Sequence, residues 1–188
     1  MDTLMDTAEE IVARTRQWLE RAVIGLNLCP FAKAVYVKDQ IRYAVSRAET
    51  PEALLADLTA ELQALVAADP AAIDTTLLIH PQVLTDFLDY NDFLGVADAA
   101  VAELGLEGVL QIASFHPRYQ FADAGPDDIE SYTNRSPYPM LHLLREASVD
   151  RAVAAFPDAA RIYERNMETL RRLGHEGWSR LGIDPKIR

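Results

Sequence analysis

The stretch TPEALLADLTAELQALVAADPAAIDTTLLIHP, residues 50–81, decides the fold of this chain. Thr50 is a favourable N-cap and Pro51 fits the first helical position, so a helix is predicted to begin here. Leucines then recur at helical spacing, and the helix is expected to stop before Pro70. The apolar run at residues 75–79 is typical of a buried strand. A helix that leads into a buried strand indicates an α/β fold.

Neighbouring segments extend this pattern on both sides. A short stretch with β-branched and aromatic residues at 41–46 predicts a strand before the helix, which completes a βαβ unit. Residues 85–104 have helical periodicity, and residues 109–115 predict a third strand with apolar residues at both parities. Strands that alternate with helices favour parallel pairing. We therefore expect a small, mainly parallel three-stranded sheet flanked by helices.

The two ends of the chain are predicted to be helical. Thr7 and Glu10 fit a capping box for a first helix that ends near Asn27. Residues 117–139 contain four prolines and no apolar period, which predicts a long loop over the surface. Helices are expected to resume at residues 139–146 and to continue as a C-terminal helical segment.

Length and composition indicate one folded domain, residues 1–188. The chain has 49% hydrophobic and 25% charged residues, an ordinary balance for a globular protein. With 29 acidic against 18 basic residues, its net charge of −11 would repel a phosphate backbone, so nucleic acid is not an expected partner. No run approaches the roughly 18 apolar residues of a membrane span. The one cysteine excludes an internal disulfide and favours a reducing, cytoplasmic setting.

Two of the predicted strands end in the same dipeptide. His80-Pro81 follows the strand at 75–79, and His116-Pro117 follows the strand at 109–115. Ligands of open α/β sheets bind at the carboxyl ends of the strands, so His80 and His116 are candidate catalytic residues if the two strands are adjacent and parallel. Alternatively, each histidine caps its strand by binding nearby backbone.

The same histidines are candidates for metal binding. Imidazole suits zinc, nickel, copper or iron, and a catalytic zinc has about three protein ligands. His142, on the predicted helix after the long loop, is the third candidate beside His80 and His116. None of them stands at a recognised close spacing such as His-x-x-x-His, so the sequence identifies no particular cofactor.

Cys29, after the first predicted helix, is a candidate thiol nucleophile. A cysteine nucleophile needs a neighbouring base, and His80 or His116 could serve if the fold brings one of them near. The alternative is a buried structural cysteine, because a free cysteine behaves as a small hydrophobe.

Polar residues around the long loop are candidates for substrate binding. In so acidic a chain, arginines beside the histidines could hold a carboxylate or phosphate in a forked geometry, which makes a small anionic molecule a plausible partner. Arg135 could instead pair with a loop aspartate. The candidate binding residues are Arg118, Asn134, Arg135 and Arg145.

Four segments carry a resemblance to a known family. They are LNLCPFA at 26–32, FHPRYQF at 115–121, NRSPYP at 134–139 and HLLRE at 142–146. With them, nearly the whole chain resembles a bacterial family of proteins with domain of unknown function 1415. The resemblance implies a fold of this length and brings no activity or catalytic residue with it.

Three functions remain open from the sequence. The first is an enzyme for a small anionic metabolite at a His/Arg site, with or without a metal. The second is a non-catalytic binding protein that presents aromatic residues of the loop to a partner. The third is a thiol enzyme that uses Cys29. Whether the protein is an enzyme at all stays undecided at this stage.

Overall fold

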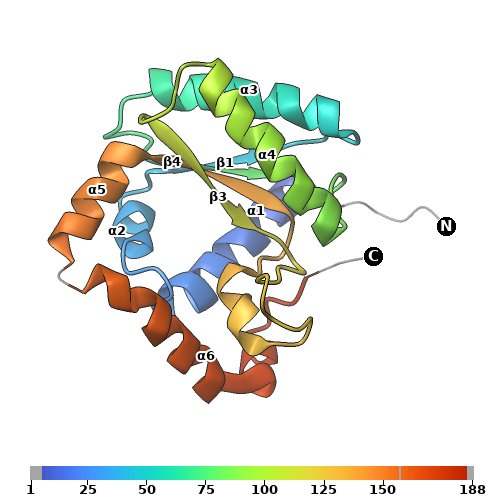
Figure 1. The fold of residues 1–188 in the computed structure, drawn as a ribbon, viewed down its shortest axis with the longest axis vertical. Helices are drawn as coiled ribbons and strands as arrows, with labels where there is room; N and C mark the ends of the chain where they lie inside the picture. Colours follow the sequence, from blue (N-terminus) through green and yellow to red (C-terminus); the bar gives the residue numbers. More distant parts are fainter. Residues whose placement is uncertain (1–5, 157, 186–188) are drawn as a thin grey trace.

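A four-stranded mixed sheet with helices on both faces forms the centre of the molecule (Figure 1). The computed structural model describes residues 6–156 and 158–185. The strands are β1 (Ile41–Val45), β2 (Thr75–Ile79), β3 (Leu110–Phe115) and β4 (Met140–Arg145). Their order is β1-β2-β4-β3, with β1 parallel to β2 and β4 antiparallel to both β2 and β3. β2 and β3 therefore run in the same direction but are not neighbours.

The three predicted strands are present as β1, β2 and β3, but the prediction of a three-stranded, mainly parallel sheet is wrong: a fourth strand is present, and two of the three pairings are antiparallel. Residues 139–146 were expected to be helical, yet β4 occupies 140–145 and separates β2 from β3. The run MLHLLR contains no β-branched residue, so its local preference is helical. Pairing on both sides overrides that preference, because the strand buries apolar side chains against both faces of the sheet.

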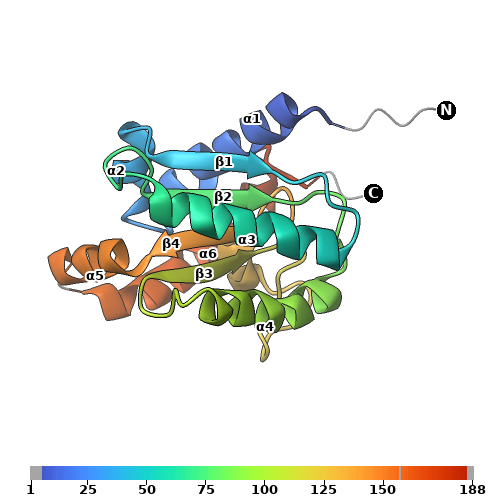
Figure 2. The same ribbon diagram turned by 90° about the horizontal axis from the view of Figure 1, so that it is seen from above.

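One face of the sheet is covered by α3 (Pro51–Ala67) and α4 (Phe87–Glu103), as Figure 2 shows. Both helices match their predicted bounds closely, and Thr50 caps α3 by accepting a hydrogen bond from the Ala53 amide. Four leucines of α3 are at most 1% exposed, namely Leu54, Leu58, Leu62 and Leu65. They pack with Leu141 and Leu143 of β4 into one apolar cluster. We call this the closed face.

The other face is covered by helices from both ends of the chain. These are α1 (Ala8–Trp18), its π-helical continuation Leu19–Ile24, α2 (Ala32–Val37), α5 (Glu146–Ala155) and α6 (Ile162–Ser179). Trp18, Leu77, Met140 and Leu170 are central to its core. In contrast to α3, the helices α2 and α5 contain no buried residue. We call this the open face.

The predicted loop after β3 contains a 3-10 helix, Ile129–Asn134. A second 3-10 helix, Ala159–Arg161, lies elsewhere, directly before α6. The first 3-10 helix packs against α6, with Tyr132 at 5.1 Å edge to face from Trp178. The predicted capping box at Thr7 and Glu10 is present at the start of α1. The loop is thus a fixed part of the fold.

Candidate functional site

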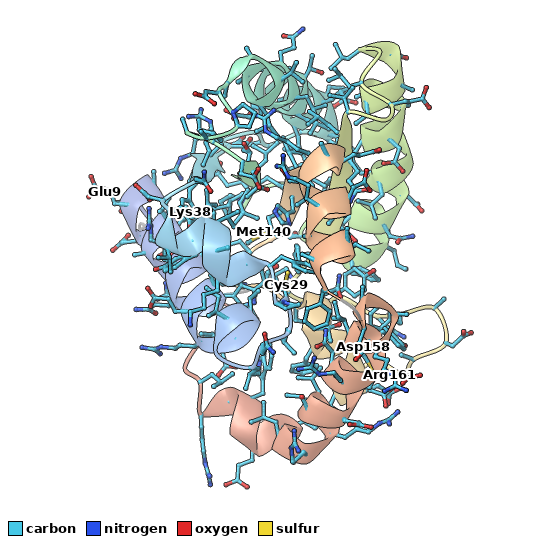
Figure 3. All side chains as sticks on the ribbon, turned by 90° about the vertical axis from the view of Figure 1, so that its left-hand side faces the viewer. Glu9, Cys29, Lys38, Met140, Asp158 and Arg161 are labelled. Atoms are coloured by element: carbon cyan, nitrogen blue, oxygen red, sulfur yellow. The ribbon has the colours of Figure 1, made fainter. Side chains whose placement is uncertain are left out.

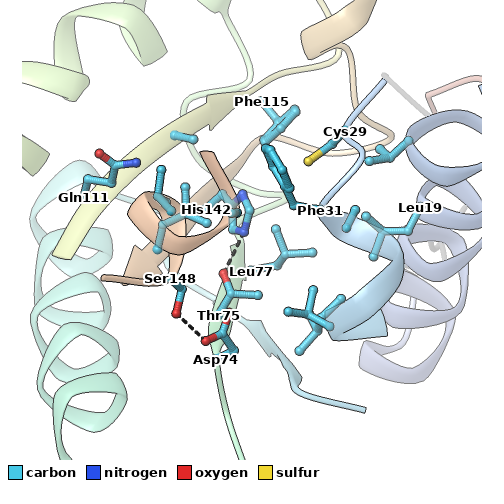
Figure 4. Close-up of a pocket in the computed structure, with 18 of the residues that line it drawn as sticks. Leu19, Cys29, Phe31, Asp74, Thr75, Leu77, Gln111, Phe115, His142 and Ser148 are labelled. Carbon is cyan, nitrogen blue, oxygen red and sulfur yellow. Dashed lines mark hydrogen bonds between the residues drawn. The ribbon is translucent and has the colours of Figure 1, made fainter. Parts of the chain in front are cut away.

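The open face encloses a cavity of about 310 Å³ between the sheet and the helices α1, α2 and α5 (Figure 4). Its walls are mainly apolar, with Leu19, Phe31, Leu77, Phe115, Leu144 and Val149 among them. The polar residues at its walls are Cys29, Asp74, Thr75, Gln111, His142 and Ser148. A cavity of this size with few polar groups has the character of a small-molecule site.

His142 lies on β4 and turns its ring into this cavity (Figure 4). Its Nε2 is 2.7 Å from the hydroxyl of Thr75, the first residue of β2. That hydroxyl donates its single proton to the Leu143 carbonyl at 2.6 Å, so it accepts from the imidazole. His142 therefore carries its proton on Nε2, which leaves Nδ1 as a hydrogen-bond acceptor.

His142 is uncharged at neutral pH. Burial lowers its pKa from 6.5 to about 4, and the nearby Asp74 carboxylate counteracts this shift only in part. A neutral imidazole with a free acceptor nitrogen can orient a ligand that donates a hydrogen bond. It can also accept a proton from a reacting group.

Cys29 lines the same cavity, in a tight segment after the π-helical turn. The preceding Asn27 adopts a left-handed conformation with φ of 52°, and the Leu28 amide donates back to the Val23 carbonyl at 2.9 Å. Asn166 of α6 holds the same segment by donating to the Leu28 carbonyl at 2.8 Å. The thiol is partly exposed, and in Figure 4 it points toward the cavity.

A hydrogen-bonded chain lies at the opposite side of the cavity from Cys29 (Figure 4). Ser148, in the first turn of α5, donates to the Asp74 carboxylate at 2.6 Å. Arg151, one turn further along α5, donates to the Ser148 hydroxyl at 3.1 Å. This chain ties α5 to the start of β2, and it places a carboxylate and a guanidinium near the cavity.

A groove of about 600 Å³ lies next to the cavity, between α2 and α5. Phe31, Val35, Asp74, Ser148 and Ala152 line both spaces. The groove adds two cations to the site, Lys38 at the end of α2 and Arg151. The cavity therefore has a polar entrance.

The structure places His80 and His116 on the other side of the sheet from His142. Both follow the carboxyl ends of their strands, as predicted, and both pack against Tyr90 of α4 with ring centroids 5.9 and 5.0 Å from it. The Tyr90 hydroxyl donates to the Met140 carbonyl at 2.8 Å and accepts from the Phe115 amide at 3.0 Å. The two histidines are thus brought together, in the core of the closed face.

Both of these histidines bind backbone in the segment between β2 and α4. His80 Nδ1 donates to the Val83 carbonyl at 3.0 Å, and His116 Nε2 donates to the Leu84 carbonyl at 3.1 Å. His116 Nδ1 also accepts from the Arg118 amide at 3.0 Å. Both rings are 0% exposed, and burial lowers each pKa to about 4. Their geometry is that of buried residues that hold a turn.

Two of the predicted substrate-binding residues are occupied by the long loop itself. Asn134 donates to the Ser114 carbonyl at 3.0 Å and fastens the loop to β3. Arg135 donates to the Tyr119 and Pro126 carbonyls, and its guanidinium lies 4.1 Å from the centre of the Tyr132 ring. Arg118 is exposed on the same loop. These side chains do not line the cavity.

Arg145 has a structural position at the end of α3. Its guanidinium donates to three carbonyl oxygens, those of Leu65, Ala68 and Ile73, at 2.7, 3.0 and 3.0 Å. A cation that binds the last carbonyls of a helix stabilises its negative end. These hydrogen bonds explain the position of the Arg145 side chain, and no substrate is needed to explain it.

No group of three or more His, Cys, Asp or Glu side chains is placed to hold a metal ion within residues 6–156 and 158–185. The proposed metal set of His80, His116 and His142 is divided by the sheet.

The aromatic loop residues also turn inward in part, since Tyr138 is 5% exposed and donates to Asp6 at 2.7 Å.

Sequence reasoning identified two of the cavity residues, Cys29 and His142, but did not combine them. It missed Asp74, Thr75 and Ser148, which lie at the start of β2 and of α5. The available signal was the pair of polar residues that precedes the apolar run of β2. These polar residues indicate a site only once β4 is known to pair with β2, because that pairing brings His142 next to them.

The fold and the cavity define an α/β protein with a mainly apolar cavity on the open face. The family model described as "Protein of unknown function (DUF1415)" matches residues 10–180, so the chain belongs to this family. Neither the curated proteins nor the solved structures contain a match to the chain. In the described part of the chain, no helix is both long and apolar enough to cross a membrane.

Proposed function

We propose that this protein binds a small, largely apolar molecule in the cavity of the open face, with His142 as the polar anchor. The observation that carries the proposal is a preformed apolar cavity of about 310 Å³ with a neutral, oriented imidazole at its wall. Small-molecule sites combine these features, namely apolar walls and a few convergent polar groups.

The anchor determines which ligands are favoured. Because Nε2 of His142 donates to Thr75, only Nδ1 is available to a ligand, and it accepts a hydrogen bond. A hydroxyl or amide donor on the ligand would meet this requirement. A ligand without a donor would leave the nitrogen unpaired, at a cost of about 1–3 kcal/mol.

Ligand binding can be tested with a fluorescent apolar probe and a panel of small alcohols that displace it. The variant Ala113→Leu places extra carbon atoms on β3, at the cavity wall, and is expected to abolish binding. Ala102→Leu is the matched control, because Ala102 is exposed on α4. Equal binding by wild type and Ala113→Leu would show that the ligand lies elsewhere.

The anchor itself is tested by His142→Ala, with His175→Ala as the control. His175 is exposed on α6 and lies outside the cavity. Loss of one hydrogen bond predicts about fivefold weaker binding of an alcohol for His142→Ala and no change for His175→Ala. Equal affinities would remove His142 from the site.

A second candidate function is thiol chemistry, favoured by one observation: Cys29 and His142 line the same cavity. In a thiol enzyme, the free nitrogen of His142 would take the thiol proton while sulfur attacks the ligand. Iodoacetamide labelling of Cys29 near neutral pH should then be fast in wild type and slower in His142→Ala. An unchanged labelling rate would exclude activation of Cys29 by His142, and the protein would then bind the ligand without thiol catalysis.

The enzyme expected from the sequence, with His80 and His116 as its centre, has less support from the geometry. Both imidazoles are fully buried and bonded to backbone, and Asn134, Arg135 and Arg145 bind carbonyl oxygens of the chain. We therefore place the site at His142 and Cys29.

A further inference from the structure

We infer that the ligand is an amphiphile whose anionic head binds Lys38 and Arg151 in the groove between α2 and α5, while its apolar body fills the cavity. This inference rests on the proposed small-molecule function and adds the chemical class of the ligand. The juxtaposition of an apolar chamber with a cationic entrance is the observation behind it.

The groove and the cavity lie next to each other. Five residues line both, and two of these, Phe31 and Ala152, come from the segments on either side of the entrance. Figure 3 shows α2 and α5 on opposite sides of the segment that carries Cys29, with Lys38 labelled on α2. A molecule that extends past these shared residues would have one end in the cavity and the other in the groove.

Charge at the entrance favours an anion. Lys38 and Arg151 line the groove, and in the part of the chain that the structure describes Asp74 is the only carboxylate that lines either space. Two cations and one anion leave a local charge of +1, in a chain whose net charge is −11. Asp74 is also engaged by the Ser148 hydroxyl. The groove is thus a cationic spot on an acidic protein, suited to a carboxylate or phosphate head.

The cavity suits the apolar body of the ligand but not its charged head. No lysine or arginine among the described residues lines the cavity, and its walls come mainly from leucine, valine, alanine and aromatic side chains. A charge moved inside would lose its hydration without a partner, so the head must remain in the groove. The ligand is therefore expected to place its apolar body in the cavity and its charged head in the groove.

The two helices at the entrance are held by the Ser148–Asp74 hydrogen bond and by partly buried side chains. Neither α2 nor α5 contains a buried residue. The contact across the entrance is between Phe31, just before α2, and Phe156, just after α5, with ring centroids 6.0 Å apart. An aromatic pair of this kind contributes about 0.5–1.5 kcal/mol, which binding of an apolar body can outweigh.

The test compares three eight-carbon probes by calorimetry, each with a hydroxyl at the far end of the chain that can donate to Nδ1 of His142: 8-hydroxyoctanoate, 1,8-octanediol and 8-hydroxyoctyltrimethylammonium, called octanoate, octanol and the ammonium probe below. Wild type should bind octanoate at least about fivefold more tightly than the ammonium probe, and added salt should weaken octanoate binding only. Lys38→Gln and Arg151→Gln should each weaken octanoate binding by about threefold to fivefold and leave octanol binding unchanged. Lys33→Gln is the matched control, because Lys33 is on α2 but lines neither space.

Each outcome separates the two proposals. If octanol and octanoate bind in the cavity but the charge variants and salt change nothing, the anionic head is excluded and the small-molecule function stands. Tighter binding of the ammonium probe would overturn the head group in favour of a cation. If none of the three probes binds, the proposed function fails and the inference fails with it.

Discussion

The two faces of the sheet are packed to different standards. On the closed face, four leucines of α3 are at most 1% exposed and meet β4 directly. On the open face, α2 and α5 bury no residue, and about 310 Å³ remains between them and the same strand. Protein interiors are normally filled to crystal-like density, so the space is a feature of the fold.

The histidines follow the same division. His80 and His116, on the closed face, are 0% exposed and bind backbone carbonyls. His142, on the open face, binds one hydroxyl and keeps an acceptor nitrogen beside empty space. The comparison teaches that burial alone does not identify a functional histidine. His80 Nε2 also lacks a hydrogen-bond partner, so an unused nitrogen alone does not distinguish His142; its position beside the cavity does.

The largest expected effect comes from adjacent leucines of β4. Leu143 is 0% exposed on the closed face, whereas Leu144 lines the cavity. Leu143→Ala should lower the free energy of unfolding by about 2–5 kcal/mol, because it leaves a hole in a packed core. Leu144→Ala should cost below about 2 kcal/mol, because its neighbours already border a void. Urea unfolding measures both, and equal losses would contradict the division into two faces.

The next effect separates the histidines. His116→Ala leaves the Leu84 carbonyl and the Arg118 amide without their partner, and it should lower the free energy of unfolding by about 2–4 kcal/mol. His142→Ala should cost about 1 kcal/mol, because the Thr75 hydroxyl keeps its bond to Leu143. Thermal and urea unfolding of both variants would test this order. A larger loss for His142→Ala would make it the structural histidine.

Much of the closed face could be predicted from the sequence. Thr50, Pro51 and the leucine spacing identify α3, and the apolar run before His80 identifies β2. These signals are local, since caps and periodicity act within a few residues. The placement of His80 and His116 at strand ends was also correct. Their roles depended on carbonyls of the segment between β2 and α4, which no spacing reveals.

The open face could be predicted only in fragments. β4 reads as a helix because leucine and methionine favour helices, and only its pairing with β2 and β3 decides otherwise. Arg145 was expected to bind substrate, yet it caps α3 from the end of β4. The cavity itself arises from loose packing of α2 and α5. Such a cavity depends on distances between helices and strands in the folded protein, which cannot be predicted from local sequence patterns.

A third test is the loss of stability in acid. Burial lowers the pKa of His80, His116 and His142 from 6.5 to about 4, so between these pH values the unfolded chain binds protons that the folded chain does not. Stability is therefore complete above pH 6.5 and falls as the pH drops toward 4, by up to about 1.4 kcal/mol per pH unit for each histidine. Unfolding of wild type and His116→Gln across this range should show a flatter profile for the variant. Parallel profiles would mean that His116 is not neutral in the folded protein.

The smallest effect distinguishes two serine–aspartate pairs, one on each face. Ser46, at the end of β1, is 4% exposed and donates to Asp57 of α3 at 2.5 Å, while Ser148 donates to Asp74 at 2.6 Å beside the groove. Ser46→Ala should lower the free energy of unfolding by about 1.5 kcal/mol, because it leaves the partly buried Asp57 carboxylate and the buried Ala48 amide short of a partner. Ser148→Ala should cost about 0.5 kcal/mol, because water in the groove can replace the hydroxyl at Asp74. Urea unfolding resolves the two values if both variants are measured with the same wild type. A Ser148→Ala loss as large as that of Ser46→Ala would mean that α5 is as firmly held as α3, and entry between α2 and α5 would then lose its physical basis.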